Sequence, residues 1–360
     1  MESKHLASLP QLGFTSSFAR SLADLKAESP GPELLAGRVV FESQEHYRLA
    51  TAAGELDARP AGRLRREAEL PAVGDWVAFA PQVDGVVPIL HVLPRRTCLS
   101  RKVAGEETRE QVVAANVDSV FVVMGLDGDF NLRRLERYVV MIGASGAQPV
   151  VVLSKADLHP DPAGARLDAL GAASGAPVHC VATPSGEGLE PLRAYLEEGK
   201  TVALVGSSGA GKSTLLNGLC GQEVMRTGAV RGSDDRGRHT TTHRQLVRLP
   251  GGGLLIDNPG IREIQLWAGE EDLSEAFEDL EELARSCRFR DCRHQGEPGC
   301  EVQAALADGR LDPGRFRNWL DLQKEIQHLE RRRDVAASRK EDRRLGRLYK
   351  RVQAEKNSRR

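Results

Sequence analysis

The chain has 360 residues, of which 40% are hydrophobic and 28% are charged; this composition excludes a disordered chain and predicts a globular protein of two or three domains. No apolar run approaches the roughly 20 residues that a membrane span needs, and the N-terminus lacks the apolar core of a signal peptide. The net charge is −1, but residues 324–360 carry +8 and the remainder carries −9. A basic end on an acidic body predicts a polyanionic partner. We expect a cytoplasmic monomer that does not bind membranes.

Residues 1–35 are expected to form a loosely ordered N-terminal arm. Residues 36–100 hold short β-rich runs separated by turn residues, a spacing typical of a small barrel. The runs are Gly37–Phe41, Tyr47–Thr51, Asp75–Phe79 and Val86–Leu93. A five-stranded OB-type barrel fits this length. Such barrels often bind oligonucleotides, and the sequence leaves open whether this one binds RNA or is purely structural.

Residues 101–268 show a different pattern, in which apolar strands alternate with helices. Asn131 is placed to cap a helix that continues through Ile142. The strands are expected at Val117–Met124, Val150–Leu153, Val202–Val205 and Leu254–Ile256. This alternation predicts one α/β domain with a parallel sheet that is covered by helices on both faces.

A phosphate-binding loop follows the third of these strands, with the spacing Gly206-x4-Gly211-Lys212-Ser213. Glycines at this spacing let backbone N–H groups turn toward phosphate oxygens, and the helix that follows points the positive end of its dipole at the anion. Lys212 is expected to reach the β- and γ-phosphates, and the Ser213 hydroxyl is expected to bind Mg²⁺. The predicted loop residues are Gly206, Ser207, Ser208, Gly209, Ala210, Gly211, Lys212, Ser213 and Thr214.

A guanine-binding motif is predicted where the strand Val150–Leu153 ends. Its residues are Ser154, Lys155, Ala156 and Asp157. The Asp157 carboxylate is expected to accept hydrogen bonds from N1–H and the exocyclic amine of guanine, a donor pair that adenine lacks. The stem of Lys155 would pack on the face of the base. Residues 182–188 follow another short strand and are a second candidate for contacting the base through their N–H groups.

A motif for Mg²⁺ and the γ-phosphate runs from Asp257 to Gly260, directly after the strand Leu254–Ile256. An aspartate at a strand end can hold Mg²⁺ through water, and the Gly260 N–H can sense the γ-phosphate. Thr241 is expected to complete the Mg²⁺ shell, and its neighbour Thr240 is the alternative.

Slow intrinsic hydrolysis is expected because Ile261 stands where many GTPases have a glutamine that orients the attacking water. His239 is a candidate for positioning that water. The alternative is that His239 only packs or contacts RNA.

In most GTPases the phosphate loop comes first and the guanine motif later, whereas here Ser154–Asp157 precedes the phosphate loop and Asp257 comes last. The order therefore predicts a circularly permuted domain. A compact domain tolerates such a permutation because its termini usually lie close together at the surface.

Residues 269–335 are helical and charged in pattern and hold a cluster of metal-ligand side chains. Cys287, Cys292, His294 and Cys300 fall within fourteen residues and predict one structural Zn²⁺ site, since Zn²⁺ prefers four tetrahedral ligands of this kind. Metal binding would supply folding energy that the loop lacks; a redox pair or free thiols are the alternatives. Helices are expected at Glu275–Ala284 and around a stripe consisting of Phe316, Trp319, Leu322, Ile326 and Leu329. Residues 336–360 are expected to be a basic tail.

Together these motifs resemble the bacterial RsgA family of small-subunit-dependent GTPases, over residues of about 36 to 330. The resemblance rests on Gly74–Val77, Ala115–Asp118, Ser154–Asp157, Gly206–Thr214, Gly237–Thr242, Asp257–Gly260 and the Cys₃His cluster. It implies an OB barrel, a permuted GTPase domain and a zinc domain. It further implies slow GTP hydrolysis that is stimulated by the 30S subunit and its 16S rRNA, and release of assembly factors. The family usually has Asn or Thr where Ser154 stands, which implies a lower guanine affinity here.

Two other functions are compatible with part of the sequence. An ATP-using P-loop kinase or transporter-type ATPase would share the phosphate loop but would need a different base pocket. A non-catalytic RNA-binding scaffold would use the barrel, the zinc cluster and the basic tail. The presence of Lys212, Ser213 and Asp257 argues against the scaffold.

Overall fold

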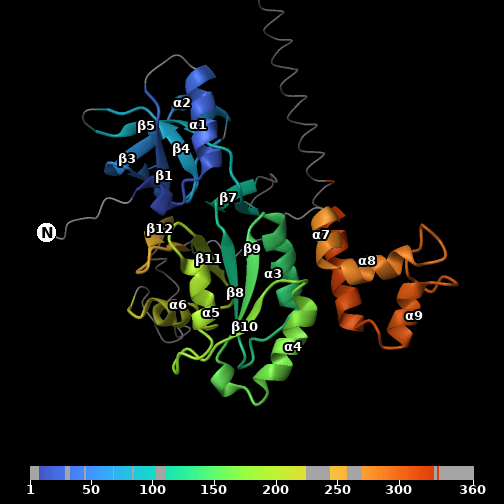
Figure 1. The fold of residues 1–360 in the computed structure, drawn as a ribbon. Helices are drawn as coiled ribbons and strands as arrows, with labels where there is room; N and C mark the ends of the chain where they lie inside the picture. The colour runs from blue at the N-terminus through green and yellow to red at the C-terminus, as the bar shows by residue number, and fades with distance from the viewer. Residues whose placement is uncertain are drawn as a thin grey trace, which may run out of the picture. The chain divides into compact units, whose positions relative to one another are not determined.

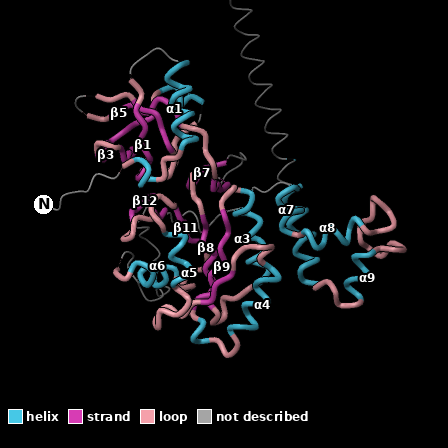
Figure 2. Tube along the Cα trace, in the orientation of Figure 1, coloured by secondary structure: helices cyan, strands magenta, loops and turns pink. Residues whose placement is uncertain are grey.

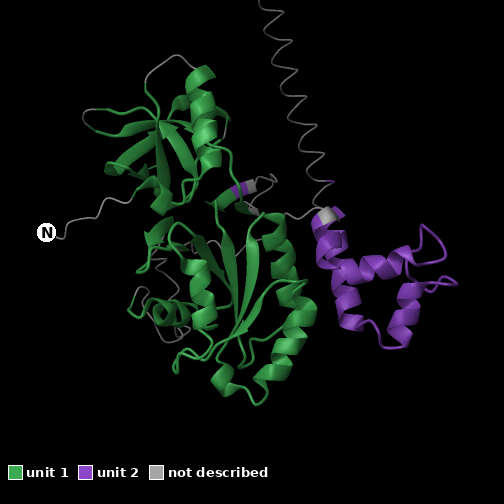
Figure 3. Cartoon of the chain, viewed as in Figure 1, with its two compact units in different colours: residues 1–101, 112–264 green, residues 102–111, 265–360 purple. Residues whose placement is uncertain are grey.

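The computed structural model describes residues 8–28, 33–43, 46–67, 69–82, 85–102, 110–223, 244–257, 270–327 and 331. The chain divides into two compact units (Figure 3). Unit 1 comprises residues 1–101 and 112–264, and unit 2 comprises residues 102–111 and 265–360. In the described part of the chain no helix combines the length and the apolar character that crossing a membrane requires.

The described part of the N-terminal arm, residues 8–28, is helical, so the expectation of a loosely ordered arm is wrong there. A short 3₁₀ helix η1 (Leu9–Leu12) precedes α1 (Ser16–Glu28). Phe14 precedes α1, and Phe18 lies in its first turn. Their ring centroids lie 4.7 Å and 5.9 Å from that of Trp76 in the barrel. This aromatic contact fixes the arm on the barrel wall.

Five strands form a closed barrel, as predicted. The strands are β1 (Leu35–Ser43), β2 (His46–Thr51), β3 (Gly54–Pro60), β4 (Trp76–Phe79) and β5 (Val87–Val92). Their order is β1-β2-β3-β5-β4, and pairing of β4 with β1 closes the ring. Strand β3 was not predicted from the sequence, because its segment is polar and only two of its seven residues are buried. The short helix α2 (Gly62–Glu67) links β3 to the second half of the barrel.

A mainly parallel sheet forms the α/β part of unit 1 (Figure 1). Its strands are β8 (Ser119–Gly125), β9 (Gln148–Ser154), β10 (Val178–Cys180), β11 (Thr201–Val205), β12 (Arg244–Arg248) and β13 (Leu254–Asp257). The order is β10-β9-β8-β11-β13-β12, with every pairing parallel except β12 with β13. The predicted parallel sheet is therefore confirmed, with one antiparallel strand next to β13.

Helices cover both faces of this sheet. Helices α3 (Leu132–Ala144) and α4 (Pro162–Ala172) pack on one face. Helices α5 (Glu190–Arg193) and α6 (Lys212–Cys220) pack on the other, next to the 3₁₀ helix η3 (Ala194–Leu196). Alternate residues of β8 serve the two cores, because side chains alternate across a strand: Val122 joins the α3 side and Val123 the α6 side. As predicted, Asn131 caps α3, its side chain accepting a bond from the Arg134 N–H at 2.9 Å.

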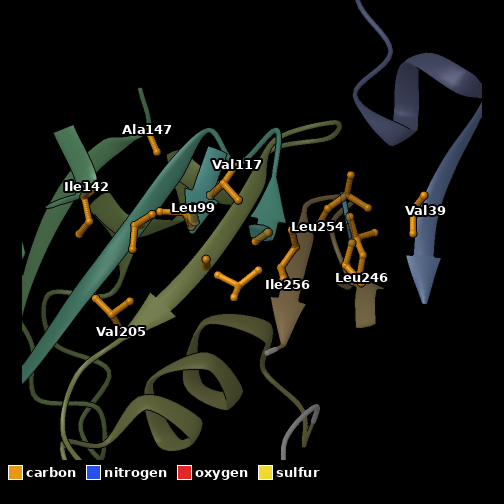
Figure 4. Packing of buried hydrophobic residues seen from close by; sticks show 14 of the residues in the cluster. Val39, Leu99, Val117, Ile142, Ala147, Val205, Leu246, Leu254 and Ile256 are labelled. Carbon is orange, nitrogen blue, oxygen red and sulfur yellow. The ribbon is translucent and has the colours of Figure 1, made fainter. Parts of the chain in front are cut away.

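The barrel and the α/β sheet are hydrogen-bonded into one sheet, because β12 pairs with β1. The guanidinium of Arg244 lies 3.2 Å from the Glu42 carboxylate at this junction. Burial raises the pKa of Glu42, and Arg244 opposes that shift. One hydrophobic core runs across the junction, from Val39 on β1 to Ile256 on β13 (Figure 4).

Arg38 on β1 joins three parts of unit 1. Its buried guanidinium donates to the carbonyls of Leu12 in the arm, Gly74 in the barrel and Asn116 before β8. Burial lowers the pKa of Arg38 to about 10, which leaves it cationic at neutral pH. These bonds hold the arm and barrel against the start of the α/β sheet. Another two-stranded sheet, β6 (Cys98–Lys102) with β7 (Glu110–Ala115), precedes β8.

In residues 270–327 helices alternate with loops (Figure 2). The helices are α7 (Glu270–Ala276), α8 (Glu278–Arg285), α9 (Glu301–Ala307) and residues 313–327. The predicted single helix Glu275–Ala284 is wrong, because the chain leaves helical geometry at Phe277, with φ −124° and ψ 40°. Phe277 is fully buried there, under the guanidinium of Arg315 at 4.5 Å. The described members of the predicted apolar stripe are buried: Phe316, Trp319, Leu322 and Ile326.

Candidate functional site

The carboxyl ends of the parallel strands place the predicted nucleotide-binding segments along one edge of the sheet. In the register of the sheet, Gly125 at the end of β8 lies opposite Ser154 at the end of β9. On the other side of β8, Val122 lies opposite Val205 of β11, after which the phosphate loop begins. Segments that are about 50 residues apart in the sequence therefore meet, which is the usual place for a ligand in an α/β sheet.

The phosphate loop has the backbone geometry that a phosphate site needs. Gly206, Gly209 and Gly211 all have positive φ, at 137°, 83° and 85°. At Gly206 a side chain is also excluded by space, since a Cβ would lie 2.1 Å from the Val123 carbonyl oxygen. Gly211 is the N-cap of α6, so the first free N–H groups of that helix face the loop.

Lys212 begins α6, and its ammonium turns back into the loop. It donates to the carbonyls of Gly206 at 2.8 Å and Ser207 at 2.5 Å. The loop thus encloses the positive charge of Lys212 beside the backbone N–H groups of its glycines. This arrangement suits the negative β- and γ-phosphates of a nucleotide. Ser213 follows on the first turn of α6, and Thr214 is exposed.

Ser154, the first residue of the base motif, is buried against the phosphate loop. Its side chain is only 2% exposed. The hydroxyl donates to the Ala210 carbonyl at 2.6 Å and lies 3.2 Å from the Met124 carbonyl. Ala210 is itself 1% exposed. The serine therefore ties the end of β9 to the phosphate loop, and its hydroxyl is already occupied by backbone.

The other residues of the base motif are less buried, and of these Ala156 packs partly against the core. Lys155 has a left-handed backbone, with φ 59°, and its ammonium is ion-paired with the carboxylate of Asp127. Ala156 and Asp157 belong to the short helix η2 (Ala156–Leu158), and the Asp157 side chain is exposed. Asp127 was not among the site residues predicted from the sequence. The signal available was an acidic residue just after a buried strand, at the edge where ligands bind.

The segment 182–188 lies beside the base motif. The Ala156 N–H donates to the Val181 carbonyl at 3.1 Å, which joins η2 to the end of the short strand β10. The segment turns back on itself, with the Ala182 N–H bonded to the Glu187 carbonyl at 3.0 Å. Gly188 ends it with φ 76°, where a Cβ would lie 2.0 Å from the Cys180 carbonyl. The backbone of residues 182–188 is thus fixed against the end of β10.

The predicted Mg²⁺ and switch residues are only partly described. Asp257 ends β13, which runs parallel to β11, so its backbone lies at the same edge as the phosphate loop. The Asp257 side chain and the residues Gly260, Thr241 and His239 lie outside the described part of the structure.

The four predicted metal ligands converge within unit 2, and their ligand atoms all lie within 4.8 Å of one another. Nδ1 of His294 lies 3.6 Å from Sγ of Cys287 and 3.4 Å from Sγ of Cys300, and the two sulfurs are 3.9 Å apart. Tetrahedral zinc, with bonds of about 2.3 Å to sulfur and about 2.0 Å to nitrogen, separates its ligand atoms by about 3.5 to 3.8 Å. The fourth ligand is Cys292, and the cluster fits a Cys₃His zinc site.

The environment of His294 favours metal binding. Burial lowers the pKa of His294, which keeps the imidazole neutral at physiological pH, and a neutral ring is the form that binds metal. The ring packs near Trp319 and Phe316, with centroid distances of 5.9 Å and 6.5 Å. The metal site therefore shares its wall with the apolar stripe of residues 313–327.

Comparison with known proteins agrees with this arrangement. The sequence profile described as RsgA GTPase matches residues 92–267. A protein of Opitutus terrae named small ribosomal subunit biogenesis GTPase RsgA is 46% identical over 355 residues, covering 95% of this chain and 96% of that protein. The chain belongs to the RsgA GTPase family. It is therefore a GTP hydrolase, and the family resemblance noted from its motifs is confirmed.

Solved structures support the fold of this RsgA family member. YjeQ from Thermotoga maritima superposes with a TM-score of 0.62 at 25% identity, covering 82% of this chain and 99% of that one. YloQ, whose structure is described as a circularly permuted GTPase, superposes with a TM-score of 0.58 at 24% identity, covering 82% of this chain and 96% of that one. The predicted fold class, with a barrel before a permuted GTPase domain, is confirmed.

Replacing Ser154 with Ala should lower the free energy of unfolding by about 1 to 2 kcal/mol, because the buried Ala210 carbonyl would lose its donor. Replacing it with Thr, which keeps the hydroxyl, should cost less. Denaturant unfolding without nucleotide measures both variants. Equal stability of the Ala variant and the unmodified protein would show that the bond between the two loops contributes nothing.

Proposed function

We propose that this GTPase binds the 30S ribosomal subunit and hydrolyses GTP during late maturation of that subunit, promoting the release of assembly factors. The observation that carries the proposal is the extent of the match: a relative named for small ribosomal subunit biogenesis aligns with 95% of the chain. The alignment is thus long enough to take in the barrel and the metal cluster as well as the GTPase domain. We place this activity in the cytoplasm, and we expect the chain to act as a monomer.

Two exposed groups of arginines support binding to 16S rRNA. One group lies on α2 of the barrel and the other surrounds the metal ligands. The residues are Arg63, Arg65, Arg66, Arg288, Arg290 and Arg293. Arginine side chains are the most frequent partners of nucleic-acid phosphates, and they position a protein on its target. The Cys₃His cluster would hold the second group in a fixed loop.

In the proposed mechanism the phosphate loop and Lys212 neutralise the β- and γ-phosphates of GTP. Mg²⁺ would be held by the Ser213 hydroxyl, by Thr241 and, through water, by Asp257; it would neutralise charge that develops on the phosphates. Gly260 would contact the γ-phosphate, and His239 would position the attacking water once the chain is docked on the subunit. Asp157 would select guanine, with Lys155 packed on the base. GDP would remain in the same site.

Hydrolysis should respond to the ribosomal partner. Purified 30S subunits should raise the GTP turnover number at least about tenfold, because in the proposed mechanism His239 positions the attacking water only once the chain is docked on the subunit. The measurement is phosphate release with 30S, with 50S and with neither. Equal turnover in all three reactions would refute the proposal that the small subunit is the partner.

Replacing Asp157 with Asn should weaken GTP binding about 100-fold, because two hydrogen bonds to a carboxylate would be lost. The same variant should gain affinity for xanthosine triphosphate, whose C2 carbonyl can accept a bond from the new amide. Competition with a labelled guanine nucleotide measures both. Asp168→Asn, at an exposed position of α4, is the matched control and should bind GTP normally. Unchanged GTP affinity of the Asp157 variant would rule out this aspartate as the selector.

The purified chain should contain one zinc ion. Cys300→Ala should lose it, and the far-ultraviolet helical signal should fall, because metal binding supplies folding energy to residues 287–300. Cys220→Ala, which removes a thiol of unit 1, is the control and should retain the metal. Elemental analysis and circular dichroism make the comparison, and a zinc-free protein with full helical content would contradict a structural metal.

A further inference from the structure

The ion pair between Asp127 and Lys155 joins two loops at the carboxyl edge of the sheet. Asp127 follows β8, and Lys155 follows β9, the neighbouring parallel strand. The hydrogen bond from Lys155 is the main cause that lowers the pKa of Asp127. Both side chains are partly exposed, at 40% for Asp127 and 31% for Lys155. A pair this exposed adds little to folding stability. We therefore looked for a role of the pair in ligand binding.

Room for the pair depends on Gly125. A Cβ at this residue would lie 2.6 Å from Oδ1 of Asp127 and 3.5 Å from Cδ of Lys155. Any larger residue at the end of β8 would therefore push the carboxylate away. The glycine, the aspartate and the lysine stem form one packed group.

The backbones on both sides of the pair are already fixed. The Leu126 N–H donates to the Ser154 carbonyl at 2.9 Å, and the Ala156 N–H donates to Val181. Lys155 itself is held at φ 59°, and its carbonyl accepts from the Leu158 N–H at 3.0 Å. With the backbone fixed, the remaining freedom lies in the rotamers of the Lys155 side chain, and the Asp127 carboxylate restricts these rotamers. Restricting them before a ligand arrives removes part of the entropy cost of binding.

The neighbouring acidic residue does not compete for this lysine. Asp129 is ion-paired with Arg134 on the first turn of α3, at 2.6 Å. Each of the two carboxylates of this loop therefore has its own cation. The specific partner of Lys155 in the described structure is Asp127.

We propose that Asp127 is a positioning residue of the guanine site, which holds the Lys155 stem in the orientation that packs on the base. This inference rests on the proposed role of Ser154–Asp157. Because the lysine packs on the face of the base and does not contact the edge that distinguishes purines, Asp127 contributes to affinity and leaves base selection to Asp157. It affects GTP and GDP alike, since both carry the same base.

The test is a double-mutant cycle on nucleotide affinity. Asp127→Asn should raise the dissociation constants of GTP and GDP by a similar factor, about three- to tenfold, and raise KM while leaving kcat unchanged. Asp127→Glu, which keeps the charge, should recover part of the loss. In a Lys155→Ala background, Asp127→Asn should have no further effect. The discrimination between GTP and xanthosine triphosphate should not change.

One control variant and three outcomes separate the possible results. Asp168→Asn makes the same charge change on exposed α4 and should leave the dissociation constants unchanged. Additive losses from Asp127→Asn and Lys155→Ala would show that the aspartate does not act through the lysine and would overturn the inference. Normal nucleotide binding by Asp127→Asn, with impaired binding by Lys155→Ala and Asp157→Asn, would overturn the inference on Asp127 but would leave the proposed base site supported. Normal binding by all three variants would instead refute the proposed base site, and the inference with it.

Discussion

The parallel alignment of β8, β9, β10, β11 and β13 is the constraint on which the nucleotide site depends. Parallel strands have their carboxyl ends at the same edge of a sheet, so the loops that follow these strands all lie along that edge. The position of a loop along this edge does not depend on the order in which the strands occur in the chain. The base motif after β9 and the phosphate loop after β11 can therefore exchange their order without moving. Circular permutation leaves the chemistry intact because the sheet, and not the chain, sets the positions.

Side chains and backbone then join these loops into a continuous rim. The Ser154 hydroxyl binds the phosphate loop, Lys155 binds the loop after β8, and the Ala156 N–H binds the end of β10. Ser154 therefore links two loops through its hydroxyl. The resemblance to the family leads us to expect Asn or Thr at this position. Of these three ties, only the Ser154 hydroxyl reaches the phosphate loop, and the other two hold the base motif to its neighbouring loops.

The same sheet extends beyond the nucleotide site. Strand β12, which follows residues 224–243 in the chain, pairs with β13 on one side and with barrel strand β1 on the other. The strand that leads out of the predicted switch segment is therefore bonded directly to the barrel, and Arg38 bonds the barrel to the arm and to Asn116. In unit 2, four side chains that could hold a metal ion converge beside a buried apolar stripe in a short, charged helical region.

The sequence by itself determined the elements whose chemistry is local. The glycine spacing at 206–211, the cap at Asn131 and the spacing of Cys287, Cys292, His294 and Cys300 all follow from neighbours in the chain, as does the alternation of apolar strands with helices. Tertiary structure alone decided the helical arm, the polar strand β3 and the break at Phe277, because each depends on a distant partner. It also decided the burial of the Ser154 hydroxyl against Ala210 and the pairing of Asp127 with Lys155. Such contacts form only when separate strands align, and no local pattern records which loops that alignment brings together.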